Sequence, residues 1–275
     1  MKLLFLGDIV GRPGRDLIRR HVRALASRYG ADLVIANGEN AAGGAGITRD
    51  NMLEILSAGV DVITSGNHVW DKRETLEFIG NEPRLIRPAN YPEGTPGLGS
   101  YVATAGNGVR VGVINVMCRV FMNTIDDPFR VAEREISRVK QDGATVIFVD
   151  FHAEATSEKI AFAYYLDGKV SAVIGTHTHV QTADDRILPG GTAALTDVGM
   201  TGPHDGVIGM DKDGVIARFV SGLPARFESA TGDPRLHGVV VAVDPANGKA
   251  TAIERIALTE DQLKEITDTV SAARA

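Results

Sequence analysis

From Lys2 to His179 the chain alternates short runs of apolar, often β-branched residues with segments whose apolar residues recur at helical spacing. Continuous apolar runs predict strands that are buried on both faces, and helices between such strands predict parallel connections. The expected strands lie at residues 2–6, 33–36, 60–64, 109–116, 145–151 and 172–174. This alternation predicts an α/β fold with a sheet that is parallel over much of its width.

Helical signals separate these strands. Pro13 opens the first expected helix, where its missing N–H is tolerated. Residues 49–58 are expected to form a helix that is capped by Thr48 and stopped by Gly59. Further helices are predicted at residues 74–79, 131–141 and 158–166.

The chain after His179 has a different pattern. Strand-like runs are expected at residues 192–196, 215–219, 237–243 and 251–257, joined by turns rather than helices. Residues 244–248 are typical of a hairpin turn, and a last helix is expected to begin at Thr259, with Gln262 placed for a capping box. We therefore expect two packed β-layers, with no linker or boundary that would divide residues 1–275 into more than one domain.

Composition limits the functional classes. The 275 residues are 44% hydrophobic and 23% charged, which is ordinary for a globular protein. A net charge of −6 without a Lys/Arg-rich run disfavours binding to duplex nucleic acid. The one cysteine, Cys118, predicts no internal disulfide and a reducing compartment. Since no apolar stretch approaches the roughly 18 residues that span a bilayer, we expect a cytoplasmic protein without membrane association.

Polar clusters directly follow five of the expected strands. They contain Asp8; Glu39 and Asn40; Asn67 and His68; His152; and His177 and His179. In open α/β sheets, ligands bind in the crevice beyond the carboxyl ends of the strands. The clusters are therefore expected to converge there.

Seven of these side chains suit metal ligation: two carboxylates, two amides and three imidazoles. This mixed oxygen and nitrogen set fits Mn, Fe or Zn better than a thiolate-dependent metal. Seven donors exceed the needs of one ion, but they fit two ions that share a bridging carboxylate. Because two such ions can clamp a phosphoryl oxygen and activate a water, a small phosphorylated substrate is expected.

Each residue also has an ordinary structural interpretation. Asp8 alone would fit a turn or a helix cap, Asn40 a turn, and His152 a satisfied half-buried histidine. His177 and His179 carry more weight, since alternate residues of an extended segment lie on one side. The coincidence of clusters at five strand ends favours a metal site over these separate interpretations.

Other candidates lie outside this pattern. His21 falls in the first helix and His237 begins a strand, so both are expected to be structural. His204 lies in a loop, where an ordinary role and a place at the edge of the site are both open. Asp197 could orient a ligand histidine, although a turn aspartate is the simpler interpretation. Arg119 could contact phosphate or simply be exposed.

The order of these motifs resembles that of the calcineurin-like metallophosphoesterases, and more closely that of the bacterial YmdB subfamily. The motifs are Gly7-Asp8-Ile9-Val10-Gly11, Asn37-Gly38-Glu39-Asn40, Gly66-Asn67-His68-Val69-Trp70-Asp71, Phe151-His152-Ala153-Glu154, Gly175-Thr176-His177-Thr178-His179-Val180-Gln181-Thr182 and Thr196-Asp197-Val198-Gly199-Met200-Thr201-Gly202. The resemblance runs through nearly the whole chain. It implies a four-layer αββα sandwich of mixed parallel and antiparallel sheets, a dinuclear site, and phosphodiesterase activity of the kind reported on 2′,3′-cyclic nucleotides.

Carried over motif by motif, the resemblance implies a role for each candidate. One ion would be held by Asp8, Glu39, Asn40 and His179, and the other by Glu39, Asn67, His152 and His177, with Glu39 as the bridge. His68 would be the catalytic histidine that stabilises or protonates the leaving oxygen.

Two positions depart from the superfamily pattern. Its first motif is usually Asp-x-His, whereas Val10 stands here, and its second is usually Gly-Asp, whereas Glu39 follows Gly38. Asn40 is the natural replacement for the lost histidine. An amide in place of an imidazole favours harder ions such as Mn or Fe(II), with Zn or Mg as alternatives.

Other functions stay open at this point. A phosphomonoesterase would use the same site. A metal-dependent amidohydrolase would need an early His-x-His, which comes late here. A non-catalytic metal- or nucleotide-binding regulator would not need His68 beside a complete ligand set. A homo-oligomer is compatible with the sequence.

Overall fold

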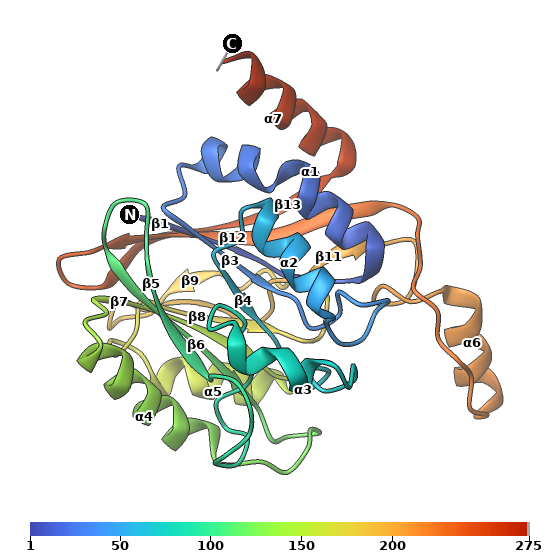
Figure 1. Cartoon of the computed structure of the whole chain (residues 1–275), viewed down its shortest axis with the longest axis horizontal. Helices are drawn as coiled ribbons and strands as arrows, with labels where there is room; N and C mark the ends of the chain where they lie inside the picture. The colour runs from blue at the N-terminus through green and yellow to red at the C-terminus, as the bar shows by residue number, and fades with distance from the viewer. Residues whose placement is uncertain (274–275) are drawn as a thin grey trace.

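The computed structural model describes residues 1–273, which fold into four layers: helices, sheet, sheet, helices (Figure 1). The first sheet contains β1 (Lys2–Leu6), β2 (Asp8–Ile9), β3 (Leu33–Asn37), β4 (Val62–Thr64), β11 (Met200–Pro203), β12 (Pro234–Asp244) and β13 (Lys249–Thr259). The second contains β5 (Ser100–Thr104), β6 (Arg110–Met117), β7 (Val146–His152), β8 (Ala172–Thr176), β9 (Arg186–Ile187) and β10 (Ala193–Leu195).

Both sheets are mixed. The first has the order β2-β11-β12-β1-β3-β4, with β13 paired to β12, and the second has the order β5-β6-β7-β8-β10-β9. The pairs β1–β3 and β3–β4 are parallel, whereas β1–β12 is antiparallel. In the second sheet β6, β7 and β8 are parallel and β5 is antiparallel to β6. The predicted αββα sandwich with mixed sheets is confirmed.

Helices cover the outer face of each sheet. The first sheet is covered by α1 (Gly11–Tyr29), α2 (Arg49–Ala58) and α7 (Glu260–Ala272), and the second by α4 (Pro128–Gln141) and α5 (Thr156–Tyr165). The short helices α3 (Thr75–Phe78) and η1 (Ile79–Asn81) follow β4. Among the described residues, no helix is both long enough and apolar enough to cross a membrane.

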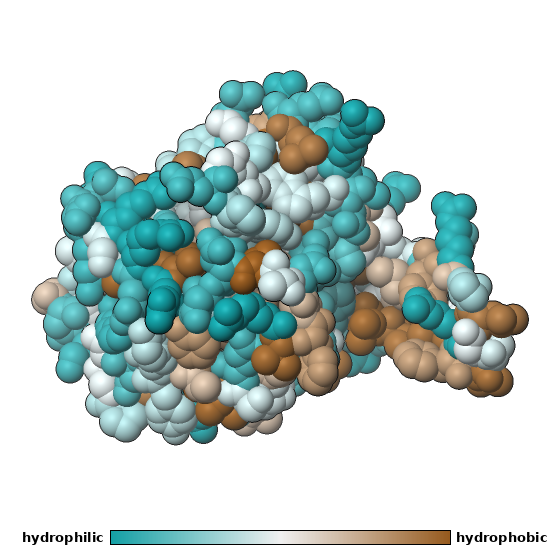
Figure 2. All heavy atoms as spheres, turned by 90° about the horizontal axis from the view of Figure 1, so that it is seen from below, coloured by the Kyte–Doolittle hydropathy of each residue, from teal (hydrophilic) through white to brown (hydrophobic). Residues whose placement is uncertain are grey.

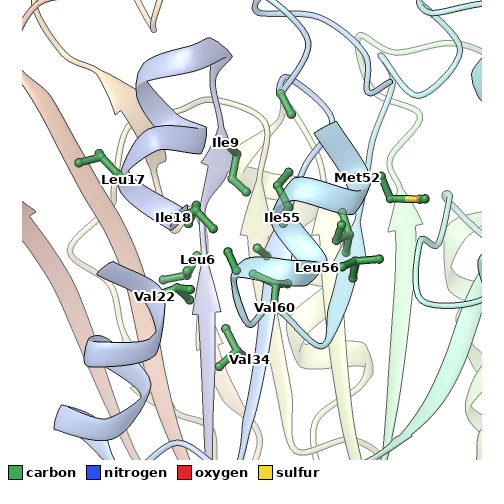
Figure 3. Packing of buried hydrophobic residues seen from close by; sticks show 14 of the residues in the cluster. Leu6, Ile9, Leu17, Ile18, Val22, Val34, Met52, Ile55, Leu56 and Val60 are labelled. Atoms are coloured by element: carbon green, nitrogen blue, oxygen red, sulfur yellow. The ribbon is translucent and has the colours of Figure 1, made fainter. Parts of the chain in front are cut away.

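Three apolar cores hold the layers together. In the outer core of the first sheet, Ile18 and Val22 of α1 and Ile55 of α2 pack on Leu6 and Val34 of the strands (Figure 3). A second core fills the space between the sheets, where the rings of Phe5 and Phe148 lie 4.9 Å apart. A third core packs α4 and α5 on the second sheet. Strands such as β1 are buried on both faces, and this burial explains why their sequences are continuous apolar runs.

Local capping signals were reliable guides to helix ends. Thr48 Oγ1 accepts a hydrogen bond from the Asn51 N–H at 3.2 Å, and α2 ends at Gly59 as predicted. Thr259 and Gln262 form the predicted capping box at the start of α7. The first helix begins at Gly11, two residues before the predicted start, so Pro13 lies in its first turn.

The prediction of a strand at residues 215–219 is wrong. These residues lie inside α6 (Lys212–Ser221), so the elements after His179 are not joined by turns alone. The β-branched Val215 and Ile216 favoured a strand, but local capping decides the outcome. Asp211 caps the helix by accepting hydrogen bonds from the N–H groups of Asp213 and Gly214, and Gly222 ends it in the left-handed conformation. The sequence also left β2, β5, β9 and β11 unassigned.

Residues 207–230, which we call the arm, leave the first sheet after β11 and return to it at β12. The arm carries α6, which stands apart from both sheets (Figure 1). We call the two chain segments of the arm that flank α6 its stalks. They are joined by backbone hydrogen bonds from Asp211 N to Glu228 O (2.8 Å) and from Ala230 N to Gly209 O (2.9 Å). The arm is thus an insertion between two strands of the first sheet, and it carries one helix.

Candidate metal centre

The predicted site residues lie at strand ends of both sheets. Asp8, in β2, comes two residues after β1; Glu39 and Asn40 follow β3; Asn67 and His68 follow β4; His152 ends β7; and His177 and His179 follow β8. Because β1, β3, β4, β7 and β8 present their carboxyl ends on one side of the sandwich, the topology brings both sets together.

Three donor atoms converge on Nε2 of the fully buried His152. Its Nε2 lies 2.9 Å from Asn67 Oδ1, 3.1 Å from Glu39 Oε1 and 3.1 Å from His177 Nδ1. Glu39, His152 and His177 form a group whose ligand atoms all lie within 4.8 Å of one another. This spacing and this donor set are those of a cation site.

Unpaired oxygens mark a second part of the centre. Asp8 Oδ1, Glu39 Oε1 and Asn40 Oδ1 are buried and accept no hydrogen bond from the described residues; Glu39 Oε1 is near His152 without hydrogen-bond geometry. The Asn40 amide nitrogen donates to the Gly44 carbonyl at 3.0 Å, which fixes the orientation of its oxygen. Burying an acceptor without a hydrogen-bond partner costs free energy. These three oxygens, which we call the metal cradle, therefore fit metal ions that take oxygen ligands.

Hydrogen bonds define which nitrogen of each histidine is free. Thr176 Oγ1 donates to Asp150 Oδ1 (2.7 Å) and therefore accepts from His152 Nδ1 (2.9 Å). His177 Nε2 faces the Glu154 carboxylate at 3.0 Å, and His179 Nδ1 donates to the Ile208 carbonyl at 2.8 Å. When the rings are neutral, each has one nitrogen lone pair left for a cation.

Burial and charge set the ionisation of these groups. Burial would raise the pKa of Glu39, but the charge of the adjacent His152 outweighs it and lowers the pKa to about 2. Burial lowers the pKa of His152, yet the Glu39 carboxylate raises it to about 9. Burial, reinforced by the charge of His152, lowers the pKa of His177 to about 3, and burial lowers that of His179. Burial also raises the pKa of Asp8 well above its usual value.

The backbone around His177 and His179 is not the extended segment that we expected. Their φ angles are 97° and 65°, a region that residues other than glycine rarely adopt. The two rings consequently face different partners, Glu154 and Ile208. Such conformations cost about 1–3 kcal/mol each and cluster at functional sites.

His68 is placed differently from the other site histidines. Its Nδ1 lies 2.8 Å from Asp71 Oδ2, and its backbone N–H donates to Glu39 Oε2 at 3.1 Å. The sequence did not suggest the pairing with Asp71, and no hydrogen bond to Nε2 is formed by the part of the chain that the structure describes. His68 is thus held beside the metal cradle without belonging to the converging donor set.

A cleft of about 640 Å³ opens onto this centre. One side, the polar wall, contains Glu39, Asn40, His68, His177 and His179. The facing side, the arm wall, contains Val207, Ile208, Met210, Val215, Phe219 and Phe227, with Arg218 beside them. The volume is that of a site for a small organic ligand.

Comparison with known proteins identifies the family. A family model described as YmdB-like protein matches residues 4–256. The chain belongs to the YmdB-like family. It is 51% identical over 263 residues, 96% of this chain and 99% of the relative, to the 2′,3′-cyclic-nucleotide 2′-phosphodiesterase of Bacillus subtilis (strain 168).

One solved structure supports this assignment, and a second shares the fold. A novel phosphatase from Mycoplasma pneumoniae matches with a TM-score of 0.87 and 35% identity, covering 98% of each chain. A 5′-nucleotidase precursor from Thermus thermophilus matches with a TM-score of 0.56 and 15% identity, over 99% of this chain and 59% of that one, and shows the shared fold alone. The prediction of an enzyme that hydrolyses phosphoric esters is confirmed, and the YmdB-like family and the Glu39 group together indicate divalent metal.

Beneath this YmdB-like site lies a buried aspartate that the sequence analysis missed. Asp150 accepts hydrogen bonds from Asn37 Nδ2 (3.0 Å), Thr64 Oγ1 and Thr176 Oγ1, and it thereby joins strands of both sheets. Burial raises its pKa to about 6. A carboxylate inside the apolar run of β7 was the available signal, because a charged residue in a fully buried strand needs partners.

Asp197 is neither a simple turn residue nor a direct partner of a ligand ring. It is buried and pairs with the buried Lys159 of α5 at 2.7 Å. Its Oδ2 also accepts from the backbone N–H (3.1 Å) and hydroxyl (2.8 Å) of Thr178, and Lys159 donates to the Thr176 carbonyl. The ion pair therefore holds the segment that carries His177 and His179.

The remaining candidates lie away from the donor set. His21 is buried and contacts Thr267 of α7, which agrees with a packing role. His204 and His237 face each other with ring centroids 4.6 Å apart. Arg119 pairs with Asp127 at 3.2 Å on the surface, and neither lines the cleft.

Proposed function

We propose that this chain is a dinuclear metal-dependent phosphodiesterase that hydrolyses small diesters, 2′,3′-cyclic nucleotides in particular. The observation that carries the proposal is the convergence of Asn67, Glu39 and His177 on His152 Nε2, beside buried oxygens that find no hydrogen-bond partner within residues 1–273. The printed activity of the Bacillus subtilis relative supports the substrate class.

We propose two ligand sets that meet at Glu39. Asp8, Glu39, Asn40 and His179 would hold one ion, and Glu39, Asn67, His152 and His177 the other. When bound, the ions would supply positive charge to the phosphoryl oxygens and acidify a water. Fe or Mn fits the amide-containing set best, with Zn or Mg as alternatives.

His68 is the proposed catalytic residue. A water oxygen attacks phosphorus and releases one proton to solvent, while the bond from phosphorus to the 2′ oxygen breaks. His68 Nε2 gives its proton to that leaving oxygen and regains one from solvent. Asp71 holds Nδ1 at 2.8 Å and thereby orients the ring, with Nε2 directed away from that contact. The ring lines the cleft beside Glu39, where a bound phosphodiester would lie.

A phosphomonoesterase is the second candidate, because the similar protein from Mycoplasma pneumoniae is described as a phosphatase. A non-catalytic regulator would leave the pairing of His68 with Asp71 without a purpose. One domain over residues 1–275, of which the last two lie outside the described part, is also a proposal; it is supported by the pairing of β12 with β1. Cytoplasmic location and homo-oligomerisation stay predictions of the sequence.

Metal analysis combined with turnover tests this proposal. Purified protein would be assayed on phosphomonoesters, linear diesters and 2′,3′-cyclic nucleotides, beside Glu39→Ala, His68→Ala and the surface control Glu77→Ala. We expect Glu39→Ala to lose metal and activity, and His68→Ala to keep metal but lose about 10²–10⁴-fold in rate. Full activity in Glu39→Ala or in metal-free protein would overturn the mechanism. Turnover of monoesters alone would remove the diesterase assignment and leave the metal site.

A further inference from the structure

The arm exposes more apolar surface than a helix in water normally does. Phe219 is 82% exposed, Val220 83% and Leu223 66%. Figure 2 shows hydrophobic surface gathered on the part of the molecule that projects, while most of the other visible surface is hydrophilic. Contiguous exposed apolar patches on globular proteins usually mark a binding site.

The two faces of α6 have different surroundings. Val215 and Phe219, one helical turn apart, both line the cleft that holds Glu39 and His68. Val220 is equally exposed but does not line the cleft. Only one face of the helix is thus placed to meet a molecule bound at the metal centre.

The arm wall offers flat, uncharged surfaces next to one planar cation. Phe219 and Phe227 both line the cleft, and the Arg218 guanidinium lies 5.1 Å from the centre of the Phe227 ring. Aromatic side chains and arginine planes are the groups on which nucleobases stack. Arg218 is the one charged or hydrogen-bonding side chain among the arm residues that line the cleft, and six apolar side chains surround it, so this wall suits a ring with a π-face better than a second phosphate.

The arm is also tied to the metal centre. The Ile208 carbonyl accepts the hydrogen bond from His179 Nδ1, and Ile208 has a positive φ of 47°. Met210 packs near Gly44, beside the loop of Asn40, so that a Cβ at Gly44 would collide with its side chain. These contacts fix the stalk of the arm wall relative to the proposed ligands.

We infer that the arm wall binds the nucleobase of the substrate, with Phe219 and Phe227 as the stacking residues that select nucleotides over diesters without a base. This inference rests on the proposed function. Since every base has a π-face, stacking without hydrogen-bond readout gives little discrimination among bases. Purines, which have the larger ring system, should be preferred modestly over pyrimidines.

The inference is tested with two five-membered cyclic phosphodiesters, one that carries a nucleobase and one that does not. Turnover of 2′,3′-cyclic AMP and of glycerol 1,2-cyclic phosphate would be measured for the wild type, Phe219→Ala, Phe227→Ala and the matched control Val220→Ala. For each Phe variant we expect kcat/KM on the nucleotide to fall about tenfold, mainly through KM, because a stacking partner is lost. The base-free diester should change less than twofold, and Val220→Ala should leave both substrates unchanged. Equal losses on both diesters, or no loss on the nucleotide, would overturn the inference.

A binding measurement separates this inference from the proposed function. Calorimetry with adenosine 3′-monophosphate should show weaker binding by Phe219→Ala than by the wild type or Val220→Ala. If the wild type hydrolyses neither diester but shows this difference, the diesterase proposal fails and the nucleobase site stands. If Phe219→Ala and Val220→Ala both change the sedimentation coefficient and lose activity alike, the arm is an interface between copies of the chain and the inference is wrong.

Discussion

The polar wall and the arm wall of the cleft differ in how each is held. On the polar side His152 is fully buried, Asp150 joins the sheets beneath it, and the buried pair of Lys159 and Asp197 fixes the loop of the last two histidines. On the arm side Phe219 is 82% exposed, and hydrogen bonds between two stalks support the helix. Groups that handle the phosphate need fixed geometry, whereas a stacking surface tolerates movement.

The largest difference in stability between the two sides is expected when a buried charge on the polar side loses its partner. Lys159→Met should lower the free energy of unfolding by about 3–5 kcal/mol, because the Asp197 carboxylate would be left buried and unpaired. Urea denaturation followed by circular dichroism measures this. Lys212→Met removes an exposed ion pair with Asp205 near the arm and should have no measurable effect. Equal losses in the two variants would mean that both sides are held alike.

A close approach on the polar side gives the next test. A Cβ at Gly66 would collide with Glu39 Oε2 and with the His152 ring. Gly66→Ala should therefore displace the ligands and reduce kcat/KM by about 100-fold, while circular dichroism stays native. Gly80→Ala, whose Cβ would meet nothing within 4 Å, is the control. Full activity of Gly66→Ala would show that the polar wall adapts as the arm does.

The pH dependence of Cys118 alkylation tests how well the interior next to the polar wall is closed to reagents. Cys118 is fully buried and its N–H donates to the His152 carbonyl, and burial raises the pKa of its thiol from 9.0 to about 11. Because the thiolate is the reactive form, a raised pKa leaves about 100-fold less of it at pH 8 than in an ordinary thiol. Alkylation should be slower by at least that factor in native than in unfolded protein, and should accelerate up to about pH 11. Native labelling at the unfolded rate would contradict this.

The smallest free energy in this comparison is expected for local opening of the arm, which limited proteolysis measures. Arg218 and Arg226 lie exposed on the arm, where local opening requires little free energy. Trypsin is expected to cut there first, leaving the sandwich folded, as mass spectrometry of the early fragments would show. A first cut within the sheets would mean that the arm is as firmly held as the polar wall.

The sequence revealed the polar wall far better than the arm. Strand ends such as Gly66-Asn67-His68 carry local signals, because the apolar run, the glycine and the polar ligands are adjacent in the chain. The roles of Asp150 and Lys159 could not be predicted in this way, since their partners lie on other strands. Asp71 was missed because a surface aspartate three residues after His68 has no distinctive pattern.

The arm was misread for a different reason. Residues 215–219 are mostly apolar and partly β-branched, and that pattern predicts a strand when pairing partners are assumed. The caps, Asp211 and Gly222, were present in the sequence and would have predicted the helix. What no local pattern could supply is that this helix would lie across a cleft from the metal ligands.

The proposed ligands come from both halves of the sandwich. Asp8, Glu39 and Asn67 belong to the first sheet, whereas His152 and His177 belong to the second, and the two halves are otherwise joined mainly by apolar packing and the contacts of Asp150. An ion shared between them would act as a crosslink that stops one sheet from sliding over the other. Resistance to heat and denaturant would then rise with metal concentration, so the supply of metal would govern how long the folded protein lasts as well as how fast it works.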